Sequence, residues 1–494
     1  MGIPVYFKTL ISDYGDSILH KNIYEDINHL FFDLNCLIHP CARELSDENE
    51  IIKKIVTEID KLIEYTGVKD TIYLAIDGIA PKMKMRQQRM RRHKSALENK
   101  YNDNQSWDTN AISPGTIFMK SLNDSLKKHI CKYQNIILDD SDNRGEGEHK
   151  ILHYIQNNNL KGKICIYGLD ADLIQLSLVS HKSNIVLLRE TTEYNIENTK
   201  GEYVYLKIDD LKKHLIDSLK IRRIIDKEKI IDDYIFICFL LGNDFMNHIP
   251  SLSLRYGGHD VLIDTYSKLQ NRYGGYFKLI DRSLKNIIHM TFFKEYINEL
   301  SILEKDMIGK TKMIRYKQYK KIRNEYYNIY KNFQTYFSNS LDSKLLSLED
   351  IYQFQYNNNL DKNSVSKMIQ NLPIFVSQEE TYSKEYDSDE CEDYMKCLMW
   401  TTHYYFNECF NWRFNSEYNH GPFIQNLDKF FNVMQNSKLK LEKDDKEYTN
   451  KEQLSYIFPK DSHSLHKFNI VSKEYNLFID LSYSRYLWEC NIKF

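Results

Sequence analysis

Short apolar runs alternate with helical patterns along the first half of the chain. Four such runs are INHLFFDLN (27–35), TIYLAIDG (71–78), KICIYGLD (163–170) and SNIVLLRE (183–190), and segments between them, such as KSLNDSLKKHICKY (120–133), have the spacing of amphipathic helices. Strands that alternate with helices usually form a mainly parallel sheet covered by helices. The pattern therefore predicts an α/β domain with a twisted, mainly parallel sheet over residues 1–265.

The pattern changes in the second half of the chain. Residues 266–377 show polar and aromatic helical periodicity, which predicts a helical connecting region. Residues 378–393, QEETYSKEYDSDECED, carry eight acidic side chains against Lys384 and predict a solvated acidic linker. Residues 394–494 open with Tyr394 and the aromatic-rich segment MKCLMWTTHYYFNECFNWRF (395–414), and they are expected to form a helix-rich region packed against the sheet.

Composition limits the class of protein without naming a partner. The net charge is −2, so a nucleic-acid site would have to come from local segregation of charge. The nine cysteines are scattered and lack zinc-site spacing, which indicates a reducing compartment and no structural zinc. The most apolar run, YIFICFLL at 234–241, is too short to span a membrane, and MGIPVYF lacks the features of a secretory signal. We therefore expect a soluble intracellular protein.

Acidic residues follow several of the apolar runs. If these runs are strands of one parallel sheet, their carboxyl ends meet at the edge where such sheets bind ligands. GEGEHK adds two acids near the expected start of a helix, and YIFICFLL, taken as a further strand, leads into GNDF. The candidate acids are Asp33, Asp77, Glu146, Glu148, Asp170, Asp172 and Asp244. The alternative is that they are unrelated helix caps and surface charges.

So many carboxylates in one cleft would repel one another unless cations neutralise them. Oxygen ligands favour Mg²⁺ or Mn²⁺ over zinc. Two such ions about 4 Å apart are the usual arrangement for attack of water on a phosphodiester. The acids therefore predict a two-metal site for Mg²⁺, in which Mn²⁺ can substitute.

A basic segment begins five residues after Asp77. Residues 82–100, KMKMRQQRMRRHKSALENK, hold eight Lys or Arg against the single acid Glu98. In a helix one face would present Lys84, Gln88, Arg91 and Arg92, which could converge on one phosphate group. A solvated face or a nonspecific nucleic-acid stripe is the alternative.

Together these segments resemble the XRN-type 5′-to-3′ exoribonucleases, relatives of the flap endonucleases. The matching text includes FFDLNCLIH, AIDGIAPKMKMRQQRMRR, WDTNAISPGTIFM, GEGEHKI, YGLDADLI, FLLGNDFMNHIPSLSLRYGG and WTTHYYFNECFNWRF. The resemblance covers both conserved regions of the family's catalytic core. One departure is NSEYNHGPF at 415–423, where the family usually has a run rich in proline and tyrosine.

The resemblance implies a fold, a reaction and residue roles. It implies a fold like that of the PIN and flap nucleases, and hydrolysis of single-stranded 5′-monophosphorylated RNA, processively, to nucleoside 5′-monophosphates. The seven acids would be metal ligands, the basic face would hold the 5′-phosphate, and His39 would stack on the terminal base together with either Trp400 or Trp412. Without the resemblance, packing is the more usual role of a histidine or tryptophan in these places.

Two other functions fit parts of the sequence. A structure-specific flap endonuclease acting on DNA would share the acids, but HIPSLSLRYGG lacks the glycine-rich spacing that this class uses to hold duplex backbone. An inactive RNA-binding scaffold would be expected to lack metal ligands. The expected location is the cytoplasm, or a host cell's cytoplasm if the source is viral, with the nucleus left open. No membrane and no obligate protein partner is implied.

Overall fold

The computed structural model of this 494-residue chain describes residues 6–20, 26–43, 45–101, 107–168, 170–191, 202–325, 327–343, 345–360, 386–434, 439–459, 476–480 and 491–493. Residues 378–385, the first part of the predicted acidic linker, lie outside these ranges. No helix in the described ranges is long and apolar enough to cross a membrane.

Within the described ranges, seven strands form one sheet in the order β1-β7-β6-β5-β2-β3-β4. The strands are β1 (Leu19–His20), β2 (Ile27–Asp33), β3 (Thr71–Ala75), β4 (Ile136–Asp139), β5 (Lys163–Tyr167), β6 (Ile185–Glu190) and β7 (Tyr203–Lys207). Strands β2 to β6 are parallel, whereas β7 pairs antiparallel with both β6 and β1. The predicted mainly parallel sheet is confirmed, and all four apolar runs named above form its strands.

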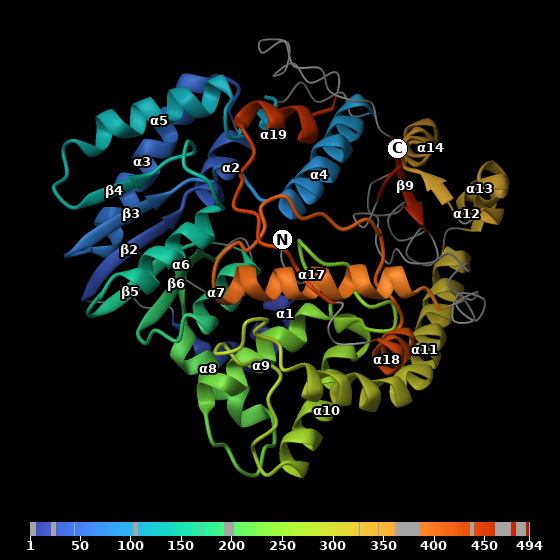
Figure 1. The fold of residues 1–494 in the computed structure, drawn as a ribbon. Helices are drawn as coiled ribbons and strands as arrows, with labels where there is room; N and C mark the ends of the chain where they lie inside the picture. Colours follow the sequence, from blue (N-terminus) through green and yellow to red (C-terminus); the bar gives the residue numbers. More distant parts are fainter. Residues whose placement is uncertain are drawn as a thin grey trace.

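Helices cover both faces of this sheet (Figure 1). One face carries α2 (Asn35–Arg43), α3 (Glu48–Thr66) and α5 (Ile117–Ile130); the other carries α1 (Tyr6–Ile18), α6 (Gly147–Asn157), α7 (Ala171–Val179) and α8 (Ile208–Ser218). Successive residues of a strand point to opposite faces, so Phe31 packs in one core while Leu30 and Phe32 pack in the other. Burial on both faces explains why these strands are continuously apolar.

Helices dominate the rest of the described chain. They are α4 (Lys82–Tyr101), η1 (Thr109–Ala111), α9 (Lys227–Phe239), η3 (Leu254–Tyr256), α10 (Gly258–Arg272), α11 (Met290–Glu325), α12 (Tyr327–Tyr336), α13 (Ser338–Asp342), α14 (Leu348–Asn357), α17 (Ser388–Phe406), α18 (Ile424–Val433) and α19 (Asn450–Ile457). A small antiparallel sheet joins β8 (Leu345–Ser347), β9 (Asn476–Asp480) and β10 (Asn491–Lys493). The long helix α17 crosses the middle of the molecule and packs on α7, which confirms that the C-terminal region lies against the sheet domain (Figure 1).

The structure differs from the sequence-based prediction at three places. The run at 234–241 lies mostly in the buried helix α9, because a short apolar run cannot distinguish a strand from a buried helix and Asp226 caps this one through the amides of Glu228 and Lys229. The boundary at 265 falls inside α10. The last six residues of the predicted acidic linker, 388–393, form the first turns of α17, capped by Asp387.

Candidate active site

Predicted acids lie at the ends of strands and at the starts of two helices, all at the carboxyl edge of the sheet. Asp33 ends β2, Asp77 lies two residues beyond β3, and Asp170 follows β5 at the N-cap position of α7. Strand β2 pairs with β3 on one side and with β5 on the other, so the strand order reverses at β2. The carboxyl edge at such a reversal is where open α/β sheets bind ligands.

Helix α6 brings two further acids to the same edge. Glu146 is its N-cap residue and Glu148 lies in its first turn, as predicted from GEGEHK. The backbone amide of Gly147 donates to Asp77 Oδ1 at 2.7 Å. A Cβ atom at Gly147 would lie 3.0 Å from Asp33 Oδ1, so glycine allows the helix start to approach this carboxylate closely.

The remaining acids join through α7 and the end of α9. Asp172 lies in the first turn of α7, and Asp244 lies five residues after α9 ends at Phe239. Lys84 Nζ ion-pairs with Glu146 Oε2 at 2.5 Å and with Asp244 Oδ2 at 3.0 Å. One ammonium group therefore joins the acids of α6 to the acid that follows α9.

Mutual repulsion shows that the acids form one cluster. Burial, followed by the charge of Asp77, raises the pKa of Asp33 to about 7. Burial, followed by the charge of Asp244, raises the pKa of Asp172 to about 7. Burial also raises the pKa of Glu148, helped by the charges of Asp172 and Asp170. The structure thus brings all seven predicted acids together, and we call them the carboxylate cluster: Asp33, Asp77, Glu146, Glu148, Asp170, Asp172 and Asp244.

The carboxylate cluster has the properties of a site for divalent cations. Asp172 is 1% exposed, and neither of its carboxylate oxygens accepts a hydrogen bond of normal geometry from the residues that the structure describes. Ligand atoms of Glu146, Glu148 and His149 lie within 4.8 Å of one another. Buried carboxylates without enough donors are stabilised by cations, and these oxygen-rich ligands fit a hard divalent ion.

These pKa shifts predict how Mg²⁺ should stabilise the protein. Between roughly pH 4 and pH 7 the folded metal-free chain keeps protons on Asp33 and Asp172 that the unfolded chain releases. Stability without metal therefore falls as pH rises through this window, and a divalent cation bound among these carboxylates would relieve their repulsion. We expect Mg²⁺ to raise the melting temperature by at least about 2 °C more at pH 8 than at pH 5.5. Differential scanning fluorimetry against NaCl of equal ionic strength measures this, and equal shifts at both pH values would contradict it.

Helix α4 confirms the predicted basic helix, and the structure places Lys84, the first residue of its predicted phosphate-binding face, among the carboxylates. Lys84 is 9% exposed and ion-pairs inside the carboxylate cluster. Periodicity placed it correctly on the face that holds Gln88 and Arg91. It could not show that the start of this face meets the acids. In this structure Lys84 neutralises carboxylates.

The next turns of α4 form a separate cationic site. Arg92 donates to Ser113 Oγ and, at 3.4 Å, to the carbonyl oxygen of Ile112, while its Nε atom is buried without a partner among the described residues. Burial, followed by the charge of Arg91, lowers the pKa of Arg92 to about 10. Gln88 Oε1 is also buried without a partner in the described chain. A half-buried guanidinium whose Nε donor has no partner among the described residues suits an anion.

His39 lies near this cationic site. It belongs to α2, which begins two residues after Asp33. Burial and then the charges of Arg91 and Arg92 lower the pKa of His39 to about 4. Its imidazole is therefore neutral at physiological pH, which suits stacking on a base.

The two candidate tryptophans have different environments. Trp400 is completely buried in α17, donates to the carbonyl oxygen of Asn411 at 2.7 Å and stacks on Tyr404. These contacts make it a core residue. Trp412 is 6% exposed, and the guanidinium of Arg144 lies 4.9 Å from its ring centroid. Of the two, Trp412 is the one with some exposed surface.

Comparison with known proteins identifies the family. The family model for the XRN 5′-3′ exonuclease N-terminus matches residues 1–191, and the model for the Xrn1 helical domain matches residues 224–393 and 375–468. The chain belongs to the XRN family of 5′-3′ exonucleases. The resemblance inferred from the motifs is therefore confirmed.

Similar XRN proteins are longer than this chain. The 5′-3′ exoribonuclease 1 of Schizosaccharomyces pombe is 31% identical over 354 residues, which are 62% of this chain and 26% of that protein. The 5′-3′ exoribonuclease 2 homolog of Drosophila melanogaster is 25% identical over 599 residues, covering 94% of this chain and 65% of that protein. The chain thus spans about a quarter of the length of the first relative.

Among solved structures, the catalytic core of Rad2 in complex with a DNA substrate is similar with a TM-score of 0.32 and 12% identity. The match covers 56% of this chain and 73% of that chain. A likeness this low supports no conclusion about substrate.

Several supporting residues of the XRN site were not predicted from sequence. The hydroxyl of Tyr404 in α17 donates to Glu146 Oε1 at 2.8 Å, and its ring stacks on His149 at 3.8 Å between centroids. Asn35 Nδ2 donates to Asp77 Oδ2 at 2.7 Å. The signals were the aromatic run HYYF and the asparagine two residues after Asp33. Neither signal indicates which carboxylate the side chain reaches.

The unusual segment at 415–423 contacts α4 mainly through its backbone. Arg86 donates to the carbonyl oxygens of Ser416 at 3.3 Å and Tyr418 at 2.7 Å, and also to the side-chain oxygen of Asn419. Carbonyl acceptors are available whatever the side chain is. The missing proline- and tyrosine-rich run therefore does not remove this contact.

Proposed function

We propose that this chain is a metal-dependent 5′-to-3′ exoribonuclease that hydrolyses single-stranded 5′-monophosphorylated RNA to nucleoside 5′-monophosphates. Membership of the XRN family supports the reaction class, and the printed names of its relatives support RNA as the substrate. The observation that carries the proposal is the convergence of seven buried or half-buried carboxylates beside Arg92, a half-buried arginine without a carboxylate partner among the described residues.

For the cofactor we propose two Mg²⁺ ions, for which Mn²⁺ can substitute. The oxygen ligands of the carboxylate cluster support this choice. Divalent ions held there would activate water and neutralise charge on the scissile phosphate. Because Lys84 already pairs with Glu146 and Asp244, its ammonium group must share these oxygens or leave them when a cation binds.

For the substrate end we propose that Gln88, Arg91 and Arg92 hold the 5′-phosphate. Electrostatic interaction between Arg92 and Asp77, and between Arg91 and Asp244, supports a phosphate site close to the carboxylate cluster. A terminal phosphate seated there would place the following linkage toward the cluster. The Ser113 hydroxyl orients the Arg92 guanidinium for this contact.

For the first base we propose stacking on His39, with Trp412 as the second aromatic partner. The neutral state of His39 and its closeness to the arginines support the first role. The residual exposure of Trp412, against the complete burial of Trp400, supports the second. Stacking on aromatic rings tolerates any base, as processive degradation of different RNA sequences requires.

For the location we propose the cytoplasm. The eight cysteines in the described part of the chain are all free thiols, which is typical of a reducing compartment.

The requirement for a free end tests this proposal. We expect a linear single-stranded RNA with a 5′-monophosphate to be degraded, and the same sequence closed into a circle to resist at equal Mg²⁺ concentration. A blunt RNA duplex should also resist, because paired ends must melt before the first base can stack. Gel analysis over time measures all three substrates. Rapid cutting of the circle would show an endonuclease and contradict the proposal.

A further inference from the structure

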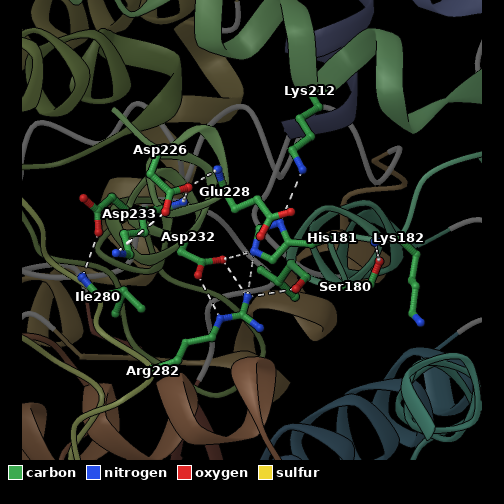
Figure 2. Close-up of polar contacts among 12 residues, drawn as sticks. Ser180, His181, Lys182, Lys212, Asp226, Glu228, Asp232, Asp233, Ile280 and Arg282 are labelled. Carbon is green, nitrogen blue, oxygen red and sulfur yellow. Dashed lines mark hydrogen bonds and ion pairs between the residues drawn. The ribbon is translucent and has the colours of Figure 1, made fainter. Parts of the chain in front are cut away.

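One arginine outside the carboxylate cluster contacts two of the helices that carry it. Arg282 lies between α10 and α11, and its guanidinium binds Asp232 of α9 through two donors, Nε to Oδ2 at 2.8 Å and Nη2 to Oδ1 at 2.6 Å. The same Nη2 donates to the carbonyl oxygen of Val179, the last residue of α7, at 2.8 Å. Figure 2 shows the guanidinium between Asp232 and His181.

A third helix contacts the same guanidinium group. The Arg282 guanidinium lies 5.0 Å from the ring centroid of Phe406, the last residue of α17. Helix α7 carries Asp172 in its first turn, α9 leads to Asp244, and α17 carries Tyr404, which donates to Glu146. Each helix that Arg282 contacts therefore carries or leads to an acid of the carboxylate cluster, or carries a side chain that binds one.

The segment that carries Arg282 is itself fixed. Asp233, which follows Asp232 in α9, is 1% exposed and accepts from the amides of Leu279 at 2.8 Å and Ile280 at 2.7 Å. Tyr266 of α10 donates to its other oxygen at 2.8 Å. Consecutive carboxylates of α9 thus hold the chain before Arg282 and the side chain of Arg282 itself (Figure 2).

The cluster needs such restraint because its acids repel one another. Asp172 lies in α7 and Asp244 lies five residues after the end of α9, and each favours separation from the other when no cation lies between them. A helix transmits a restraint along its length, and Val179 is seven residues from Asp172, or roughly 10 Å along α7. Holding the far end of α7 against α9 therefore limits how far Asp172 and Asp244 can move apart.

We propose that Arg282 is a positioning residue that holds α7, α9 and α17 together so that Asp172 and Asp244 can bind divalent cations jointly. This inference rests on the proposed metal site. It assigns to Arg282 an effect on metal affinity, in addition to any effect on stability.

The test replaces Arg282 and measures metal binding without RNA. Arg282→Met removes both charge and donors, and we expect it to weaken Mn²⁺ binding roughly threefold to tenfold, less than the 10–100-fold typical of residues bonded directly to metal ligands. Arg282→Lys keeps the charge but not the paired donors, so its loss should be smaller, about twofold. Isothermal titration with MnCl₂ well below the melting temperature gives these affinities.

A matched arginine provides the control. Arg272 also binds two carboxylates, Glu295 at 3.2 Å and Glu299 at 2.6 Å, but these belong to α11, away from the helices that carry the acids. Arg272→Met should leave Mn²⁺ affinity unchanged, even if it lowers the melting temperature.

Two results would overturn the inference. One is native Mn²⁺ affinity in both Arg282 variants, or in Arg282→Lys alone if Arg282→Met does not fold. The other is an equal loss of affinity in Arg272→Met, which would show a general effect of stability. Because the titration contains no RNA, a native protein that binds Mn²⁺ but degrades no RNA would refute the proposed function and leave this test of Arg282 intact.

Discussion

Asp172→Asn is expected to abolish RNA hydrolysis while leaving the protein folded. Asp172 is almost completely buried at the start of α7, and its carboxylate is close enough to those of Glu148 and Asp244 to interact with them electrostatically. Asparagine keeps the shape but loses the negative charge that a divalent cation requires. We expect the rate on 5′-monophosphorylated RNA to fall by about a thousandfold or more, as expected when the site loses its transition-state charge stabilisation.

The same substitution should raise stability without metal. Removing one charge relieves repulsion in the cluster, so the melting temperature of metal-free Asp172→Asn should exceed that of the native protein at pH 8 and approach it at pH 5.5, where Asp172 is already protonated. The double variant Glu146→Gln with Glu148→Gln should also lose activity, and EDTA should inhibit the native protein reversibly. Full activity in either variant or in EDTA would refute the metal mechanism.

The second large effect concerns the chemistry of the RNA end. Arg91→Ala with Arg92→Ala should weaken binding of 5′-monophosphorylated RNA by several kcal/mol, from about 1.5–3 kcal/mol for each charged hydrogen bond lost. RNA with a 5′-hydroxyl end should be affected much less, since it has no phosphate for these residues to hold. A 5′-triphosphate should already be a poor substrate for the native protein, because a site built for one phosphate has no place for the added charge and volume.

A basic residue elsewhere on α4 provides the control for this prediction. Lys94 pairs with Glu98 at 3.9 Å on the same helix, so Lys94→Ala removes a positive charge from α4 outside the proposed phosphate site. Cleavage rates of one RNA with monophosphate, triphosphate and hydroxyl ends should show the native order of preference in Lys94→Ala and a flattened order in the double variant. If the native protein degrades all three ends equally, α4 is only a nonspecific nucleic-acid surface.

The carboxylate cluster was predictable because sheet topology converts sequence position into spatial position. Acids that follow parallel strands lie at one edge of the sheet, so the sequence alone predicted that Asp33, Asp77 and Asp170 would be neighbours. The position of Glu146 and Glu148 in GEGEHK was predictable because glycines before an apolar helical pattern mark the start of a helix. Asp244 was placed correctly for the wrong reason, since the run before it is helix α9 rather than a strand.

The partners of these residues could not be predicted, because they depend on how distant segments pack. Periodicity gives the face of α4 but not what it meets, so the pairing of Lys84 with Glu146 and Asp244 was missed. Tyr404 lies 258 residues from Glu146 in the sequence, and nothing local indicates that its hydroxyl reaches this carboxylate. The acidic composition of 378–393 predicted a linker exposed to solvent. In the structure the carboxylate of Asp387 caps α17, and Glu390 is buried in that helix.

The most direct measurement of the proposed activity is the first product released from an RNA labelled at its 5′-phosphate. The native protein with Mg²⁺ should release the label as a nucleoside 5′-monophosphate, before any shortened labelled RNA accumulates, and should release none in EDTA. Labelled oligonucleotides as first products, or an intact RNA in Mg²⁺, would contradict a 5′-to-3′ exoribonuclease built on the carboxylate cluster.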